Sequence, residues 1–179
     1  KTISQIERKK GIKRTIQYRP DGNDFVCVNG KNRYTRALYG GITDFRIETS
    51  DRPVFAAYKP KDSKHICFRL QCGNQSIALD SLKFCEARYR AGRRTYRLTD
   101  PLLGKGELNI SVLAFPDAEG GIWRFTMKDM PEGALLHCYI SEIRAKNLSR
   151  NGDMGADRAD SFDAPQLPKE QKHYKLSLD

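Results

Sequence analysis

The sequence lacks long hydrophobic runs and helical periodicity. No window approaches the roughly 18 apolar residues that a membrane-spanning helix needs, so no membrane span is expected. Apolar residues seldom recur at spacings of three and four, which argues against a helical domain. The chain also starts at Lys1 without a signal-peptide core, which predicts a processing boundary there and leaves export open.

Motifs for metal binding and catalysis are missing as well. The five cysteines form no CxxC pair and the three histidines are scattered, so neither a metal site nor a cofactor is expected. The acids of the polar segment 147–171 do not have the spacing of a helix–loop–helix calcium loop. No Ser/His/Asp, Cys/His or paired-carboxylate arrangement can be recognised, so the isolated chain is expected to be non-catalytic.

The cysteines are Cys27, Cys67, Cys72, Cys85 and Cys138, an odd number that leaves at least one thiol without a partner in the chain. Cys27, Cys67 and Cys138 fall within apolar runs, where a free cysteine behaves as a small hydrophobic residue. We therefore expect mostly reduced and buried thiols. This expectation suits a reducing compartment such as the cytoplasm slightly better than an oxidising one.

What the sequence does contain is a recurrent two-residue period of hydrophobicity. Apolar and polar residues alternate in TDFRIETS, HICFRLQC and IWRFTMK, a pattern typical of half-buried strands. In the last of these, Trp123 shares its side with Phe125 and Met127 and is expected in the core. Further candidate strands lie at 15–19, 25–28, 54–58, 95–98, 110–115, 135–140 and 174–178. The pattern predicts an all-β fold, an antiparallel two-sheet β-sandwich of roughly ten strands.

Turn sequences separate these strands. RPDGND at 19–24 is expected to join the first two strands, and Asn29 and Gly30 are suited to a tight type I′ turn. The segment 81–92 is the only one that fits a helix and a strand about equally well. The predicted organisation is a basic N-terminal segment at 1–14 and a single sandwich domain at 15–179, with a long polar loop at 147–171, as a piece of a larger protein.

The charge favours anionic partners. The net charge is +10 and the sequence pI is about 9.5, which suits nucleic acid, anionic lipid or acidic polysaccharide. The segment EARYRAGRRTYR at 86–97 interleaves tyrosine with arginine, as a groove for single-stranded nucleic acid would. No known nucleic-acid-binding motif accompanies it, so nucleic acid is the less favoured partner.

The motif NRYTRALYGG at 32–41 is the strongest candidate for a contact site. Strict alternation would place Arg33 and Tyr39 on one face and Tyr34 and Arg36 on the other, and neither face is cleanly apolar. Tyrosine rings stack on sugars and guanidinium groups pair with anions, so these four residues are candidates for carbohydrate or interdomain contact. The glycines at 40–41 would allow a sharp turn beside them. A plain strand and turn is the remaining alternative.

The stretch YRPDGNDFVCVNGKNRYTRALYGG, continued by TDFRIETSDRPVFAAY, resembles the start of an uncharacterised domain-of-unknown-function family found in large exported proteins of gut-type bacteria. The resemblance is strongest over 15–60 and extends more loosely to about 165. The matching motif residues are Asn32, Arg33, Tyr34, Arg36, Leu38, Tyr39 and Gly40. Those proteins resemble glycoside hydrolases in which an N-terminal β-sandwich precedes a helical (α/α) toroid.

The resemblance implies a non-catalytic accessory domain that supports the catalytic domain of the same polypeptide and contacts carbohydrate. It also implies export to the periplasm or cell surface. The catalytic acids would lie in the toroid, outside this chain. Two alternatives stay open: a nucleic-acid-binding β-domain and a purely structural interaction domain.

Overall fold

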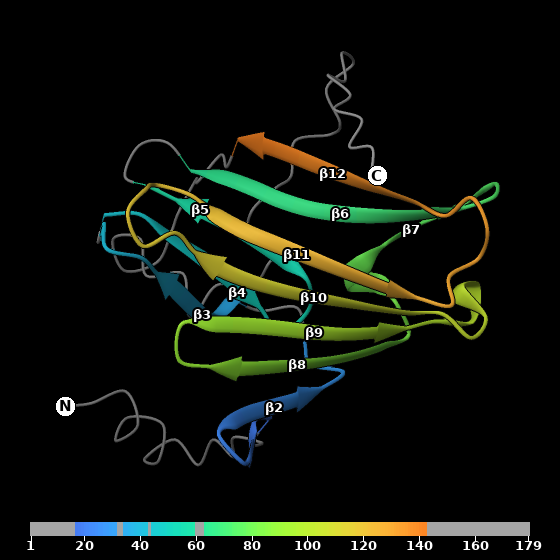
Figure 1. Ribbon diagram of the computed structural model, residues 1–179, viewed down its shortest axis with the longest axis horizontal. Helices are drawn as coiled ribbons and strands as arrows, with labels where there is room; N and C mark the ends of the chain where they lie inside the picture. Colours follow the sequence, from blue (N-terminus) through green and yellow to red (C-terminus); the bar gives the residue numbers. More distant parts are fainter. Residues whose placement is uncertain (1–16, 32–33, 43, 60–62, 143–179) are drawn as a thin grey trace, which may run out of the picture.

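The computed structural model describes residues 17–31, 34–42, 44–59 and 63–142, which form two packed antiparallel sheets (Figure 1). The first sheet has the order β1-β2-β8-β9-β10-β11, and the second has the order β12-β6-β5-β4-β3, with β7 paired to β6. The predicted all-β sandwich is therefore confirmed. The described residues contain twelve strands, against roughly ten expected.

The strands of the first sheet are β1 (Arg19–Asp21), β2 (Asp24–Val28), β8 (Phe84–Arg90), β9 (Arg93–Thr99), β10 (Glu107–Ala114) and β11 (Gly121–Lys128). Those of the second sheet are β3 (Tyr34–Tyr39), β4 (Arg46–Ser50), β5 (Val54–Tyr58), β6 (Lys64–Cys72), β7 (Gln75–Ala78) and β12 (Leu135–Glu142). Two short 3-10 helices, η1 (Leu79–Ser81) and η2 (Pro101–Leu103), connect strands. None of the helical segments in the described ranges is long and apolar enough to cross a membrane.

Aromatic side chains from both sheets meet in the core. The ring of Phe55 on β5 lies 5.7 Å from that of Tyr96 and 5.8 Å from that of Trp123, both on the first sheet. Phe68 and Phe125 pack edge to face with centroids 4.9 Å apart. The predicted inward position of Trp123 is confirmed, because the alternation of β11 sends this ring to the core and Arg124 to solvent.

Strand pairing tests two local expectations from the sequence, the structure of segment 81–92 and the turn at Asn29. The ambiguous segment 81–92 forms strand β8, in which the inward Cys85 and Ala87 are fully buried. Asn29 has a φ of 48°, which fits its expected positive φ. The type I′ hairpin is wrong, however, because β2 pairs with β1 and β8 while the chain crosses to the second sheet to begin β3.

Gly30 is needed for close packing at this crossover. A Cβ atom at Gly30 would lie 2.7 Å from Cβ of Asp51 and 2.8 Å from Sγ of Cys27. The basic segment 1–14, the polar loop 147–171 and the candidate strand at 174–178 lie outside the described residues.

Candidate functional site

Strand β3 carries most of the predicted contact motif, and a β-bulge changes its faces. Tyr34 pairs with Ser50, yet Arg36 pairs with Thr49, so Thr35 is an extra residue in the register. The bulge puts Tyr34 on the outer face of the second sheet with Tyr39, while Arg36 turns toward the first sheet. The expected sharing of one face by Tyr34 and Arg36 is therefore wrong. Arg33 lies outside the described residues.

Arg36 makes its contacts inside the margin of the sandwich. Its guanidinium carbon lies 5.2 Å from the ring centroid of Tyr18 and 5.1 Å from that of Tyr89. Its Nη1 also donates a hydrogen bond of 2.6 Å to the carbonyl oxygen of Thr35. These cation–π contacts hold the guanidinium between Tyr18, which precedes β1, and Tyr89 on β8.

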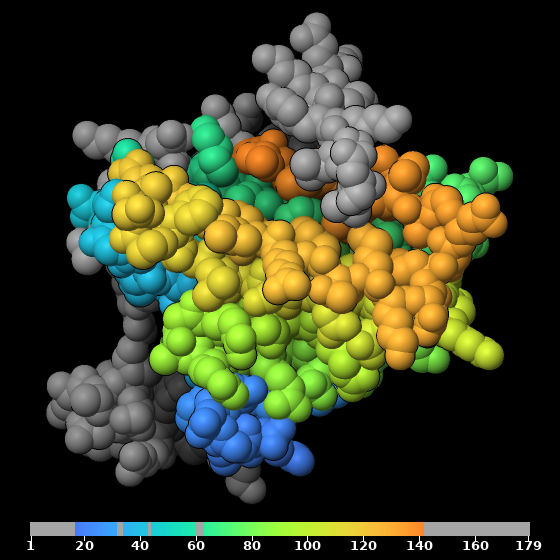
Figure 2. All heavy atoms as spheres, in the orientation of Figure 1, coloured from blue at the N-terminus to red at the C-terminus, as the bar shows by residue number. Residues whose placement is uncertain are grey.

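Tyr39 ends β3 with 55% of its surface exposed. The glycines that follow it run beneath the β10–β11 loop: a Cβ atom at Gly40 would lie 1.6 Å from the carbonyl oxygen of Phe115. The amide of Gly41 donates a 2.8 Å hydrogen bond to the carbonyl oxygen of Pro116. Figure 2 shows the cyan part of the chain beside the yellow β10–β11 loop. The glycine pair thus permits close approach of two backbones.

Tyr39 belongs to a cross-strand row on the outer face of the second sheet. It pairs with Arg46 on β4, and Arg46 pairs with Tyr58 on β5. The guanidinium carbon of Arg46 lies 3.8 Å from the ring centroid of Tyr58, and its Nε lies 2.5 Å from Oε1 of Glu48. These contacts hold Arg46 against Tyr58, and the register places Tyr39 next to Arg46; we call these three residues the Tyr39 row. Sequence reasoning missed Arg46 and Tyr58 because only sheet register aligns them with Tyr39.

Part of this outer face is shielded from solvent. Six residues point outward by the strand register and are nevertheless buried: Tyr34, Glu48, Ser50, Val54, Ala56 and His65. The apolar ones among them do not belong to the hydrophobic core between the sheets. Burial lowers the pKa of His65, against a smaller opposing effect of Asp80, and so favours the neutral imidazole. Burial raises the pKa of Tyr34, with Glu48 adding to the effect. These side chains are thus buried within the chain itself, unlike the outward side chains of a sheet that faces solvent.

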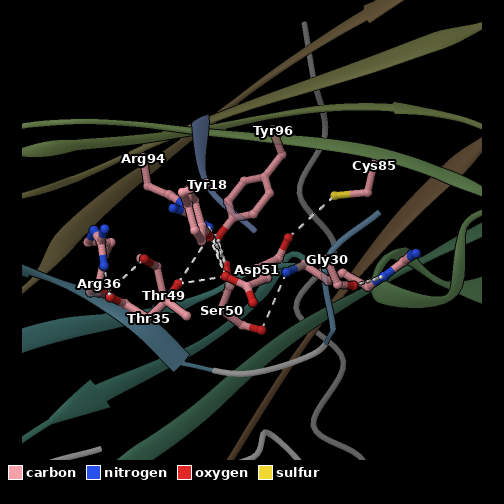
Figure 3. A network of polar contacts seen from close by, with 11 residues as sticks. Tyr18, Gly30, Thr35, Arg36, Thr49, Ser50, Asp51, Cys85, Arg94 and Tyr96 are labelled. Atoms are coloured by element: carbon pink, nitrogen blue, oxygen red, sulfur yellow. Dashed lines mark hydrogen bonds and ion pairs between the residues drawn. The ribbon is translucent and has the colours of Figure 1, made fainter. Parts of the chain in front are cut away.

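A second group of polar side chains lies between the sheets (Figure 3). Asp51 follows β4 and is fully buried; its Oδ1 accepts hydrogen bonds from the hydroxyl of Tyr18 and, at 2.7 Å, from that of Thr35. Arg94 on β9 is equally buried and donates from Nη2 to the Tyr18 hydroxyl at 2.5 Å. Nη2 of Arg94 also lies 3.7 Å from Oδ1 of Asp51. The charges therefore compensate one another out of water.

The groups of this network keep their hydrogen bonds at neutral pH, as a network that stabilises the fold would. Burial raises the pKa of Tyr18 to about 12; Asp51 also raises it, while Arg94 opposes the change. The phenol therefore stays protonated and can donate to Asp51 across the neutral pH range. Within the described residues, Oδ2 of Asp51 and Nη1 of Arg94 are buried without a hydrogen-bond partner. Sequence analysis missed this group, although Arg94 has the same strand parity as the apolar Leu98.

All five cysteines are free thiols. Burial raises the pKa of Cys85 to about 12 and that of Cys67 to about 11, which makes both poor nucleophiles at neutral pH. Cys138 was expected to be buried, and this is wrong: it lies exposed because β12 is an edge strand. In the part of the chain that the structure describes, no three His, Cys, Asp or Glu side chains are grouped as metal ligands.

The arginine–tyrosine segment at 86–97 does not form a stacking platform. Tyr96 points into the core against Phe55, and Tyr89 shares the inward parity of Ala87 on β8. Its outward positions are instead occupied by charged and hydroxyl side chains. Base stacking requires exposed rings, so this arrangement does not favour the nucleic-acid alternative.

A family model described as a domain of unknown function, DUF4450, matches residues 60–177, about two thirds of the 179-residue chain. The matched range includes the strands from β6 to β12, whereas the motif at 32–41 precedes it. Neither the curated proteins nor the solved structures yield a match to this chain.

Proposed function

We propose a function for this chain, which belongs to the DUF4450 family of domains of unknown function: it is a non-catalytic accessory domain of a glycoside hydrolase or another polysaccharide-processing protein. In this role, the sandwich supports the catalytic domain of the same polypeptide and contacts carbohydrate. The polypeptide would be exported to the periplasm or cell surface. The resemblance of the motif at 32–41 supports this proposal, together with the unequal outer faces of the two sheets.

The contrast between the outer faces is the observation that carries the proposal. Several outward side chains of β4, β5 and β6 are buried, among them Glu48, Ala56 and His65. Outward side chains of β11, such as Ile122 and Arg124, are exposed. The shielded side chains of the second sheet are buried within the chain itself, so a part of this face that is free for contact is its exposed margin at Tyr39. That margin suits contact with the remainder of the polypeptide.

The Tyr39 row suits contact with another domain. Tyrosine and arginine are enriched at the energetically important centres of protein interfaces, because each offers a large contact area with a polar tip. Tyr39 is exposed beside the shielded region, and the fixed guanidinium of Arg46 limits the entropy lost on contact. Among the residues first expected to make contacts, Tyr39 is thus the one that the described structure leaves most accessible.

The state of the carboxylates supports a non-catalytic role. Glu48 pairs with Arg46, Glu86 with Arg88, and Asp24 with Arg90 at 2.6 Å. A general acid for glycoside hydrolysis needs a raised pKa, whereas Arg90 holds the pKa of Asp24 below its usual value. The first two pairs lie within β4 and within β8, and the Asp24–Arg90 pair joins β2 to β8.

Two measurements test the proposal. Release of reducing ends from a polysaccharide panel by the isolated chain should not exceed the buffer blank, and robust hydrolysis would overturn the non-catalytic role. In the complete polypeptide, Tyr39→Ala should lower the melting temperature of the sandwich, while the same change in the isolated chain should leave it nearly unaltered. Ile122→Ala on the other outer face is the matched control, and equal effects of both variants would contradict docking through the Tyr39 row.

A purely structural interaction domain is the second candidate, because the exposed margin at Tyr39 favours it as strongly. The two functions differ in whether the chain contacts carbohydrate at all.

A further inference from the structure

The outer face of the first sheet is an open polar surface. Figure 2 views the molecule from this side, where β8 to β11 form a broad green-to-orange area. Since Tyr96, Ile110 and Phe125 point into the core, their neighbours along each strand point outward. The outward positions are held by arginine, threonine, serine and asparagine side chains far more than by apolar ones.

One row of these side chains crosses four strands in register. Arg88 on β8 pairs with Thr95 on β9, Thr95 with Ser111 on β10, and Ser111 with Arg124 on β11. Neighbouring strands lie about 4.8 Å apart, so the two arginines bracket the hydroxyl groups over a span of roughly 14 Å. We call this set the Arg88–Arg124 row.

The face around the row has an excess of positive charge. Its outward cations are Arg19, Arg88, Arg90, Arg93, Arg97, Arg124 and Lys128, and its outward acids are Asp21, Asp24, Glu86 and Glu107. Seven cations against four acids leave a surplus of three positive charges.

The acids neutralise only part of this set. Arg88 lies 2.8 Å from Glu86 and 2.9 Å from Asp21, and Arg97 contacts Glu86 and Glu107. In contrast, neither Arg93 nor Arg124 has an ion pair with any described residue, and both are exposed. Arg19 on β1 also has no ion pair with a described residue, so the uncompensated charge lies at β11, at the start of β9 and at the β1 edge.

We propose that this face binds a linear acidic polysaccharide laid across the strands along the Arg88–Arg124 row. This inference rests on the proposed accessory function and assigns its ligand class and surface. Arg124 and Arg93 would receive carboxylate or sulfate groups, because a guanidinium fork matches the geometry of such anions. The hydroxyls of Thr95 and Ser111 would bond with sugar hydroxyls between them.

The face fits a glycan better than the other polyanions. Nucleic-acid strands are held by exposed aromatic rings as well as by charge, and Tyr89 and Tyr96 point inward. A neutral glycan would not explain the surplus cations. On this sheet face hydroxyl side chains lie between cations at the regular spacing of the strands. An extended polymer can therefore make ion pairs with the cations and hydrogen bonds with the hydroxyl groups.

Calorimetric titration of the chain with polygalacturonate and with chondroitin sulfate tests the proposal. Binding is expected for at least one of them, weakening as salt is raised, whereas neutral pullulan should not bind. Arg124→Gln and Arg93→Gln should each weaken binding by about tenfold. Lys105→Gln, an exposed cation in the turn after η2, is the matched control and should leave affinity unchanged. Unfolding curves of each variant should overlay that of the parent, since the altered side chains are exposed.

A variant without the hydroxyl groups distinguishes recognition of a glycan from attraction by charge alone. Thr95→Val with Ser111→Ala should weaken glycan binding and leave any weak binding of single-stranded DNA unaltered. The proposal is overturned by absence of binding to both acidic glycans, by tighter binding of DNA, or by unchanged affinity in Arg124→Gln and Arg93→Gln. These failures would leave the accessory function standing, because that function fails on a separate observation, the hydrolysis of polysaccharide by the isolated chain.

Discussion

Arg94 and Tyr96 lie two residues apart on β9 and donate hydrogen bonds to the same acceptor, the carbonyl oxygen of Ser50 on the opposite sheet. The distances are 3.0 Å from Nη2 of Arg94 and 2.7 Å from the hydroxyl of Tyr96. The sheets of this sandwich are therefore joined by polar bonds at one end in addition to apolar packing. The junction holds the end of β4, where Asp51 begins the turn into β5.

Removing Arg94 should destabilise the fold strongly. Arg94→Met would leave the carboxylate of Asp51 buried without its cation, which costs about 3–5 kcal/mol of unfolding free energy. Tyr96→Phe, which removes one hydrogen bond to Ser50, should cost only about 1–2 kcal/mol. Urea unfolding followed by circular dichroism measures both.

The double variant Arg94→Met with Asp51→Asn provides the control for charge. It should be more stable than Arg94→Met alone, because the unpaired charge is gone. An Arg94→Met variant as stable as the parent would contradict the role assigned to the pair.

The fold should lose stability at alkaline pH through Tyr18. Its phenol ionises near pH 10 when unfolded, and burial raises its pKa to about 12 in the folded chain. Between these values the unfolded state binds fewer protons, so the free energy of unfolding falls as pH rises. Below pH 10 this contribution is fully present. Tyr18→Phe should flatten the decline between pH 10 and about 12 in urea unfolding curves. An unchanged slope would show that other tyrosines dominate.

The two motif tyrosines should respond differently to truncation. Tyr34 is fully buried, so Tyr34→Ala should lower the unfolding free energy by about 3–5 kcal/mol. Tyr39 is exposed, so Tyr39→Ala in the isolated chain should change it by about 0.5 kcal/mol or less. Thermal unfolding of the two variants distinguishes them, and similar losses would contradict the different burial of the two side chains.

Gly40 should not tolerate a side chain. The Cβ of Gly40→Ala would overlap the carbonyl oxygen of Phe115, so the backbone must shift at a cost of about 1–3 kcal/mol or more. The matched control is Ala118→Ser, an exposed position in the same β10–β11 loop, which should change stability by less than about 0.5 kcal/mol. Equal melting temperatures for the two variants would show that the loop can move away freely.

Features that depend on local alternation could be predicted from the sequence. The parity of β11 is enough to place Trp123 in the core, because successive strand residues point to opposite faces. The same rule failed for Tyr34, since an extra residue at Thr35 inverts the parity on one side of it. Nothing in the local pattern marks a bulge; it becomes visible only against the partner strand.

The polar groups illustrate the same limit over longer distances. Arg94 shares strand parity with Leu98, so its inward position could have been recognised from RRTYRLT. Its partners could not, because Ser50 is 44 residues and Tyr18 is 76 residues away in the chain. The Tyr39 row and the Arg88–Arg124 row likewise require the register of several strands.

Co-sedimentation of the isolated chain with cross-linked polygalacturonate beads tests the central claim most directly, with the supernatant assayed for reducing ends in the same tubes. The account predicts that the chain is retained on the beads at low salt and that no soluble sugar appears above the blank. Soluble reducing ends would contradict the non-catalytic role, and a chain left in the supernatant would contradict the contact with acidic polysaccharide.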